Sequence, residues 1–301
     1  MSTSNWQAID AFGEAIAAAS LGQPDIIPDG KLHRFRTPDD KPGRQSGWYL
    51  LHPDGCPAGV FGSWKLGETH TWCAKSKEDQ NQAERADFRA LIEQARQEHQ
   101  AERERQHRVA AIRAAGIWNR CMAAPADHPY LIDKVVTGHG ARLDRHGNLV
   151  IPASDGRVLT TLQFIAPDGS KRFLSGGRIG GCWFGIQSQK AGPILLGEGF
   201  ATMATLHQET GAPAVIAFNA TNLAPVSKAI RRLNPYDEIL VCADDDRWTE
   251  GNPGRSKARL AALGIGAKVL IPDFSGLDLS SRPTDWNDWM RLQRAGGRVT
   301  A

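Results

Sequence analysis

The alternation of strands and helices that begins at residue 193 constrains the fold of this chain more than any other feature. Four short apolar runs follow one another there, each ahead of a helical stretch: PILLG, PAVIAF, EILVCA and AKVLIP. Continuously apolar strands separated by helices indicate a parallel sheet covered on both faces. The sequence therefore predicts an α/β domain over residues 191–301, with its chemistry at the carboxyl ends of the strands.

The preceding 190 residues fall into three stretches of different composition. Residues 1–75 open with an amphipathic segment and continue with aromatic and β-branched runs separated by two PDG turns, which predicts a helix and a small antiparallel sheet in an α+β domain. Residues 76–120 lack proline and are dense in Glu, Arg, Gln and Ala, so a long charged helix or helix pair is expected as a connector. Residues 121–190 return to alternation, which predicts a β-rich region directly ahead of the α/β domain.

Composition excludes several classes of protein. The five cysteines among the 301 residues form no CxxC pair, so neither a zinc ribbon nor a disulfide framework is indicated. A net charge of +3 permits a polyanionic partner without requiring one. No apolar run approaches the roughly 18 residues of a membrane span, and the first residues do not resemble a secretory signal, so a cytoplasmic protein without membrane contact is expected.

Acidic clusters follow three of the predicted strands. Glu198 comes after the first run, Asp244 and Asp246 come after the third, and TDWNDW places Asp285 and Asp288 beyond the fourth. The carboxyl ends of these strands lie at the same edge of a parallel sheet. Negative charges placed so close to one another need cations to balance them. Oxygen ligands without His or Cys favour Mg²⁺ or Mn²⁺, and hence phosphoryl or nucleotidyl transfer. Each cluster taken alone is also compatible with a helix cap or a solvated loop.

Several motifs resemble a known family. Glu-Gly after one strand, Asp-x-Asp after a later one and a further acidic element resemble the Toprim domain of primases, topoisomerases and some nucleases. The segment EGFATM at 198–203 is similar to the EGYATG motif of plasmid conjugation and satellite-phage primases. The segments HPYLIDK, GSKRFLSGGRIGG and TDWND are similar to other segments of that family. Two departures are Thr202, where replicative primases carry an acid, and Met203, where the motif ends in Gly.

The resemblance implies a DNA primase, a nucleotidyltransferase of the DNA-directed RNA polymerase type that serves plasmid or phage replication or transfer. Glu198 would be the general base or a metal-linked acid that activates the attacking 3′-hydroxyl. Asp244 and Asp246 would hold the metal ions, and Asp285 or Asp288 would complete the acidic set. The implied partners are single-stranded DNA, nucleoside triphosphates and a replicative helicase, acting in trans or within a longer chain. A Toprim nuclease and a non-catalytic single-strand-binding protein are the alternatives.

Basic residues are expected to serve the nucleotide and the template. Lys171, Arg172 and Arg178 lie beside paired glycines and suit phosphates, and Lys134 is a further candidate, although a solvent-facing hairpin tip would have the same composition. In the N-terminal sheet, basic residues alternate with aromatic ones as in single-strand-binding platforms, although a small sheet also needs aromatic residues for its core. The template-binding candidates are Lys31, Arg34, Arg36, Arg44 and Trp48.

Overall fold

The computed structural model describes residues 3–76 and 78–296. The chain divides into two compact units, Met1–Arg105 and Gln106–Ala301. Each unit has hydrophobic clusters made from its own residues, as expected for parts that bury their apolar surface separately.

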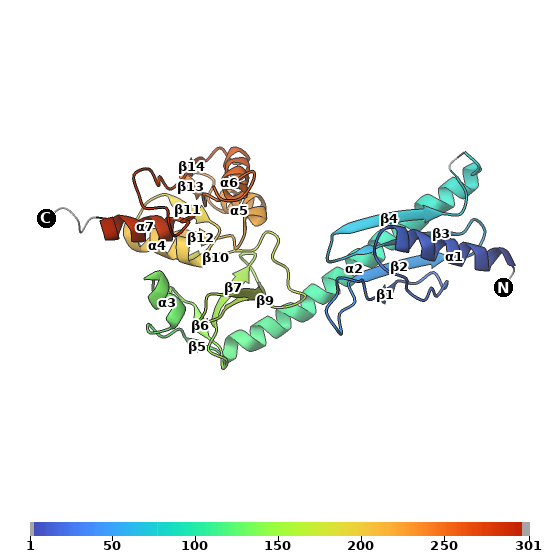
Figure 1. The fold of residues 1–301 in the computed structure, drawn as a ribbon, viewed down its shortest axis with the longest axis horizontal. Helices are drawn as coiled ribbons and strands as arrows, with labels where there is room; N and C mark the ends of the chain where they lie inside the picture. Colours follow the sequence, from blue (N-terminus) through green and yellow to red (C-terminus); the bar gives the residue numbers. More distant parts are fainter. Residues whose placement is uncertain (1–2, 77, 297–301) are drawn as a thin grey trace. The chain divides into compact units, whose positions relative to one another are not determined.

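The first unit is a four-stranded antiparallel sheet between two helices (Figure 1). Phe12 and Ile16 of α1 pack on one face of the sheet, and Leu91 and Ala95 of α2 pack on the other. The PDG turn at 53–55 joins two strands as predicted, whereas the one at 28–30 precedes the first strand. The elements are α1 (Thr3–Ala18), β1 (His33–Phe35), β2 (Gly47–His52), β3 (Ala58–Ser63), β4 (Glu68–Cys73) and α2 (Gln82–Arg120).

The charged stretch after this sheet forms one helix, α2, of 39 residues. Side chains three or four positions apart bond along its surface, among them Gln94 with Glu98, Gln100 with Glu104 and Arg105 with Glu102. Such pairs support a helix that buries little apolar surface. Within the described ranges, no helix has both the length and the apolar character needed to cross a membrane.

The second unit begins with a five-stranded antiparallel sheet, in the order β5-β6-β7-β8-β9. Ala114 of α2 packs against Val150, Leu162 and Phe164 of this sheet, which explains why the last turns of the helix are apolar on one side. The elements are β5 (Met122–Ala123), α3 (Pro129–Lys134), β6 (Arg142–Leu143), β7 (Leu149–Ser154), β8 (Leu159–Ile165) and β9 (Lys171–Phe173).

The predicted α/β region forms a second five-stranded sheet, in the order β10-β12-β11-β13-β14. Strands β12, β11, β13 and β14 are parallel as expected, but β10 pairs with β12 in the antiparallel direction, so the sheet is mixed. The strands are β10 (Phe184–Ile186), β11 (Ile194–Gly197), β12 (Ala214–Ile216), β13 (Ile239–Cys242) and β14 (Lys268–Leu270).

Helices cover both faces of this mixed sheet, which confirms the predicted α/β class. The helices α4 (Phe200–Thr210) and α7 (Trp286–Gly296) pack on one face, and α5 (Ala220–Leu233) and α6 (Pro253–Leu263) pack on the other (Figure 1). The turns that connect the parallel strands to these helices therefore lie at the carboxyl edge of the sheet.

Candidate active site

Acidic side chains from three segments meet at the carboxyl edge of the mixed sheet. Glu198 directly follows β11, Asp244 and Asp246 follow β13, and Asp285 directly precedes α7. The pKa of Asp244 is raised well above its usual value, first by burial and then by the negative charges of Asp285, Glu198 and Asp246. The structure thus brings together the carboxylates that the strand pattern placed at this edge.

Two of these carboxylates have oxygen atoms that nothing in the protein satisfies. Glu198 Oε1 and Asp244 Oδ1 are buried and have no hydrogen-bond partner. Burial, followed by the charge of Asp246, raises the pKa of Glu198 to about 7. Buried polar atoms without partners are costly, and a cation at this edge would satisfy both oxygens and lower both pKa values.

The residues fit a metal that is shared with a substrate. Among the described residues, no three Asp, Glu, His or Cys side chains already lie close enough to hold one ion. Mg²⁺ does not require such a cage, because it usually takes one or two carboxylates and completes its octahedron with water and substrate phosphates. Glu198, Asp244 and Asp246 are the residues here that could supply those carboxylates.

The middle aspartate of the DDD sequence has a structural role. Asp245 is buried, and its Oδ2 lies 2.5 Å from Arg247 Nη2 while its Oδ1 accepts a hydrogen bond of 2.6 Å from Asn252. These contacts hold the loop after β13 in place. As a result, Asp244 and Asp246 are the two members of the triplet left to serve the site.

Two glycines are required by the close packing around these acids. Asp246 Oδ2 accepts a hydrogen bond of 2.8 Å from the backbone nitrogen of Gly254, and a Cβ on Gly254 would lie 2.6 Å from the carbonyl oxygen of Asp244. A Cβ on Gly197 would lie 2.4 Å from Met203 Sδ. Met203, one of the two departures from the motif, is fully buried and fills the space that Gly197 leaves open.

The two aspartates at the start of α7 differ in what they can do. Asp285 Oδ1 accepts a hydrogen bond of 2.8 Å from the backbone nitrogen of Asp288, and Asp288 Oδ2 accepts one of 3.0 Å from the backbone nitrogen of Thr284. This reciprocal arrangement resembles a capping box. Asp285 also lines the cleft described next, whereas Asp288 is not among the lining residues.

A cleft of about 650 Å³ opens at this edge and combines both signs of charge. Asp244 and Asp285 line it together with Lys134 from α3 and Lys171 from β9, and Tyr130 from α3 completes part of its wall. Carboxylates and amines around one cavity are suited to an anionic ligand that carries its own cation.

Comparisons with known proteins agree with this geometry. Residues 193–296 match the family model of the Toprim domain. This part of the chain is a Toprim domain. Two proteins from Escherichia coli, both named DNA primase TraC, are 36% identical over 282 residues and 33% identical over 283, in each case over 88% of this chain. These matches confirm the resemblance to Toprim-type primases that the motifs indicated.

This chain spans only 26% and 20% of the length of those two relatives. The primase fragment of the bacteriophage T7 primase-helicase protein aligns with a TM-score of 0.41 and 14% sequence identity, over 56% of this chain and 70% of that one.

Residues outside the matched Toprim domain supply the cationic part of the cleft. Lys134 and Lys171, both predicted to bind phosphates, line it. Arg172 does not, because neighbouring residues of a strand point to opposite faces. Its guanidinium instead lies 4.4 Å from the centroid of the Phe164 ring.

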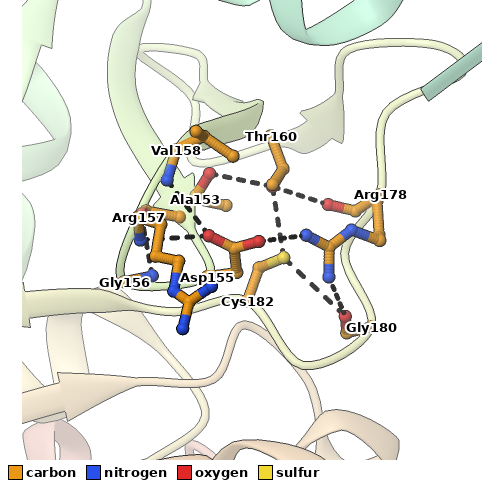
Figure 2. A network of polar contacts seen from close by, with 10 residues as sticks. Ala153, Asp155, Gly156, Arg157, Val158, Thr160, Arg178, Gly180 and Cys182 are labelled. Atoms are coloured by element: carbon orange, nitrogen blue, oxygen red, sulfur yellow. Dashed lines mark hydrogen bonds and ion pairs between the residues drawn. The ribbon is translucent and has the colours of Figure 1, made fainter. Parts of the chain in front are cut away.

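Arg178, the fourth predicted phosphate ligand, forms part of a polar network beside the Toprim domain (Figure 2). Its Nη2 lies 2.5 Å from Asp155 Oδ2, and Asp155 Oδ1 also accepts hydrogen bonds from the backbone nitrogens of Arg157 and Val158. The Thr160 hydroxyl lies 2.9 Å from the carbonyl oxygen of Arg178. Arg178 is therefore engaged in holding a loop and is not among the residues that line the cleft.

The template-binding candidates all lie in the first unit, and the structure contradicts the stacking role predicted for one of them, Trp48. Trp48 is only 2% exposed and packs against Trp64 and His99, so its ring is not available to stack on a base. Small sheets need aromatic residues in their core, and Trp48 is one of these core residues. The basic candidates are exposed: Lys31, Arg34, Arg36 and Arg44.

Tyr130 lines the cleft but was missed as a site residue at the sequence level. It is only 3% exposed, and its hydroxyl is buried without a hydrogen-bond partner. Burial and the charges of Asp285 and Asp133 raise its pKa, so the hydroxyl keeps its proton and remains a donor. The available signal was the spacing in HPYLIDK, where Tyr130 precedes Lys134 by four residues and shares its helix face.

Proposed function

We propose that this chain acts as a DNA primase, joining nucleoside triphosphates into short primers on a single-stranded DNA template. The similarity to DNA primase TraC over 88% of the chain supports this assignment. The observation that carries it is the cleft at the carboxyl edge of the Toprim domain, where Asp244 and Asp285 lie together with Lys134 and Lys171.

In the proposed reaction, a 3′-hydroxyl attacks the α-phosphorus of a nucleoside triphosphate and pyrophosphate leaves. Glu198, with a pKa of about 7, is proposed to accept the proton of the attacking hydroxyl at neutral pH. Asp244 and Asp246 are proposed to hold Mg²⁺ or Mn²⁺, which when bound would neutralise the triphosphate. Asp285 is preferred over Asp288 as the further acid because it lines the cleft.

The partners of the reaction are also proposals. Exposed basic residues of the first unit, Lys31, Arg34, Arg36 and Arg44, are proposed to follow the phosphates of the template. Trp48 is not part of this set, because its ring is buried. A plasmid or phage replication system would supply the template, and a replicative helicase that exposes single strands is the proposed protein partner.

The test is a primer-synthesis assay with the whole chain, a panel of single-stranded templates, labelled ribo- and deoxynucleotides, and Mg²⁺ or Mn²⁺. Template-dependent products are expected from the wild type, and Glu198→Gln and Asp244→Asn should reduce them by at least about 100-fold, as is typical for the loss of a group that acts in the transition state. Glu250→Gln, which changes an exposed carboxylate, is the matched control.

Each alternative has its own outcome in this assay. The absence of product from the wild type on every template would contradict the primase assignment. Cleavage of the template without nucleotide incorporation would point to a nuclease that activates water with the same acids. Template binding that is unaffected by either acidic substitution, without any catalysis, would indicate a non-catalytic single-strand-binding protein.

A further inference from the structure

Asn287 is a buried asparagine that connects α7 to two other helices. It is 2% exposed and lies in the first turn of α7, between the two aspartates of the TDWND segment. Its Nδ2 donates a hydrogen bond of 2.6 Å to the carbonyl oxygen of Lys134, at the end of α3. The same Nδ2 donates one of 2.8 Å to Thr205 Oγ1 of α4. The side chain is therefore bonded to both neighbouring helices.

The amide of Asn287 carries a cost that packing alone does not explain. Its Oδ1 is buried and has no hydrogen-bond partner among the described residues. Leaving a buried acceptor unpaired costs free energy, so a leucine of similar size would be less costly here if the position only filled space. The donor on Nδ2 is the feature that a leucine could not replace, and its shorter contact is the one with Lys134.

The hydrogen bond to Lys134 joins parts of the chain that are 153 residues apart. Lys134 precedes the matched Toprim domain, whereas Asn287 lies inside it. The bond is made to the main chain of Lys134, and the side chain of Lys134 lines the cleft. Because a lysine amine is carried on a long flexible stem, the position of its main chain decides which part of the cleft the amine can reach.

The main chain of Asn287 is bonded to an acid of the same cleft. Burial and then the charge of Asp288 raise the pKa of Asp285, whereas the backbone N–H groups of residues 288 and 287 and the positive charge of Lys134 lower it. Asn287 thus holds the Asp285 carboxylate through its backbone and the Lys134 carbonyl through its side chain. Asp285 and Lys134 both line the cavity.

Two further contacts near this end of α3 are exposed to solvent. The backbone nitrogen of Thr137 donates a hydrogen bond of 2.8 Å to Gln208 Oε1 of α4. Arg291 Nη2 of α7 lies 3.8 Å from Asp133 Oδ1. Exposed pairs of this kind contribute little, whereas water competes less for a buried hydrogen bond. The contact made by Asn287 is therefore expected to hold α3 more firmly than the other two.

We propose that Asn287 is a positioning residue that holds the end of α3 against α4 and α7, so that the Lys134 amine stays in the cleft that Asp285 lines. The inference rests on the proposed function, because it gives Asn287 a part in nucleotide binding. Asn287 is not among the residues that line the cleft, so its effect on a ligand must pass through the residues that it holds.

A double-mutant cycle measures this indirect effect. Pyrophosphate, the proposed leaving group, is the probe, and its binding to the whole chain is followed by calorimetry with Mg²⁺ present. Asn287→Leu, which keeps the size but donates no hydrogen bond, should weaken binding by about 10-fold, a typical coupling between contacting residues. Lys134→Met should also weaken it. In the Lys134→Met background, adding Asn287→Leu should cause little further loss, because the amine that Asn287 positions is already absent.

Asn222→Ala is the matched control. Asn222 is a buried asparagine of α5 whose Nδ2 donates a hydrogen bond of 2.8 Å to the carbonyl oxygen of Ala217, and it does not line the cleft. It should lower the melting temperature but leave pyrophosphate affinity unchanged. Losses that simply add in the double mutant, or a wild type that does not bind pyrophosphate, would overturn the positioning role.

Hydrogen exchange followed by mass spectrometry tests the position of α3 without any ligand. Asn287→Leu should speed the exchange of amides over residues 130–135, where α3 ends, and leave the exchange of β11 and β13 as in the wild type. Unchanged exchange in α3 would contradict the proposal. So would an equal acceleration throughout the second unit, which would indicate general destabilisation.

Failure of this inference can be told apart from failure of the primase assignment. If Asn287→Leu loosens α3 and its effect on pyrophosphate depends on Lys134, but the wild type makes no primer on any template, the positioning role stands and the assignment fails. If the wild type makes primers and Asn287→Leu matches it in the exchange of α3, in pyrophosphate affinity and in the KM for nucleotides, the assignment stands and the positioning role fails.

Discussion

Glu198 and Asp244 occupy positions where neutral side chains of the same shape would make the metal-free protein more stable. Burial raises the pKa values of both, and each has one oxygen without a partner. A carboxyl group whose pKa is higher in the folded than in the unfolded state holds its proton more tightly when folded. Its ionisation therefore opposes folding, which is the expected cost of a site prepared for a cation.

This cost predicts a specific dependence of stability on pH. The pKa of Glu198 rises from 4.5 to about 7 on folding, so the free energy of unfolding of the metal-free protein should fall as the pH rises through that window. Glu198→Gln should remove the part of this fall that Glu198 causes, leaving the part due to Asp244, and should be more stable than the wild type at pH 8 by about 1–3 kcal/mol. Urea unfolding at pH 5 and pH 8 in the presence of a chelator measures both quantities.

The same unfolding measurement can be repeated with added Mg²⁺. Mg²⁺ should stabilise the wild type more at pH 8 than at pH 5, because the ion binds the ionised carboxylates. Glu250→Gln, at an exposed position, should follow the wild type throughout. Equal pH profiles for the wild type and Glu198→Gln would show that Glu198 ionises normally in the folded protein.

At the scale of elements, the loop between β9 and β10 shows how a phosphate-loop composition can serve another purpose. Arg178 lies among glycines, but it is paired with Asp155 in the turn after β7 (Figure 2). Asn222 of α5 holds the same loop by accepting a hydrogen bond of 2.7 Å from Gly181 and donating one of 2.9 Å to the carbonyl oxygen of Cys182. The loop is thus fixed from two other elements.

A double-mutant cycle distinguishes this bracing role from phosphate binding. Arg178→Met and Asp155→Asn should each destabilise the fold and show a coupling of about 1 kcal/mol, since the pair is partly exposed. Their effects on nucleotide binding should be small and similar. A much larger loss of nucleotide affinity in Arg178→Met than in Asp155→Asn would restore Arg178 to the phosphate-binding set.

The same elements show what the sequence could predict. Strands β11 to β13 are buried on both faces, so their unbroken apolar runs identified them, and the rule for parallel sheets then placed Glu198 and Asp244. A strand of three residues such as β10 has too little periodicity to reveal its direction. Arg178 and Lys171 looked equivalent in sequence, because the partner that separates them, Asp155, is distant along the chain.

At the scale of the whole molecule, the cleft belongs entirely to the second unit. Every residue that lines it lies between Tyr130 and Asp285, within Gln106–Ala301. The exposed basic residues proposed for the template lie in the first unit. Binding of nucleotide and binding of template are therefore expected to be separable.

A fragment of residues 106–301 tests this separation. It retains Ala110 and Ala114, the buried α2 residues of this unit, so it should fold cooperatively and bind pyrophosphate with the affinity of the whole chain. Its affinity for single-stranded DNA should fall, with a smaller dependence on salt concentration, because phosphate contacts are lost. Circular dichroism, calorimetry and fluorescence anisotropy provide the three measurements. Undiminished DNA binding would place the template on the second unit.

The Toprim match begins at residue 193, whereas Tyr130, Lys134 and Lys171 precede it. A recombination event that exchanged residues 193–296 alone would combine the acidic residues of one protein with the lysines of another at the same cleft. Proteins that acquire this Toprim domain by recombination should accordingly acquire the antiparallel sheet β5–β9 with it. Substitutions on the two sides of residue 193 should be correlated. Chimaeras joined ahead of α3 should retain nucleotide affinity, whereas chimaeras joined at residue 193 should lose it.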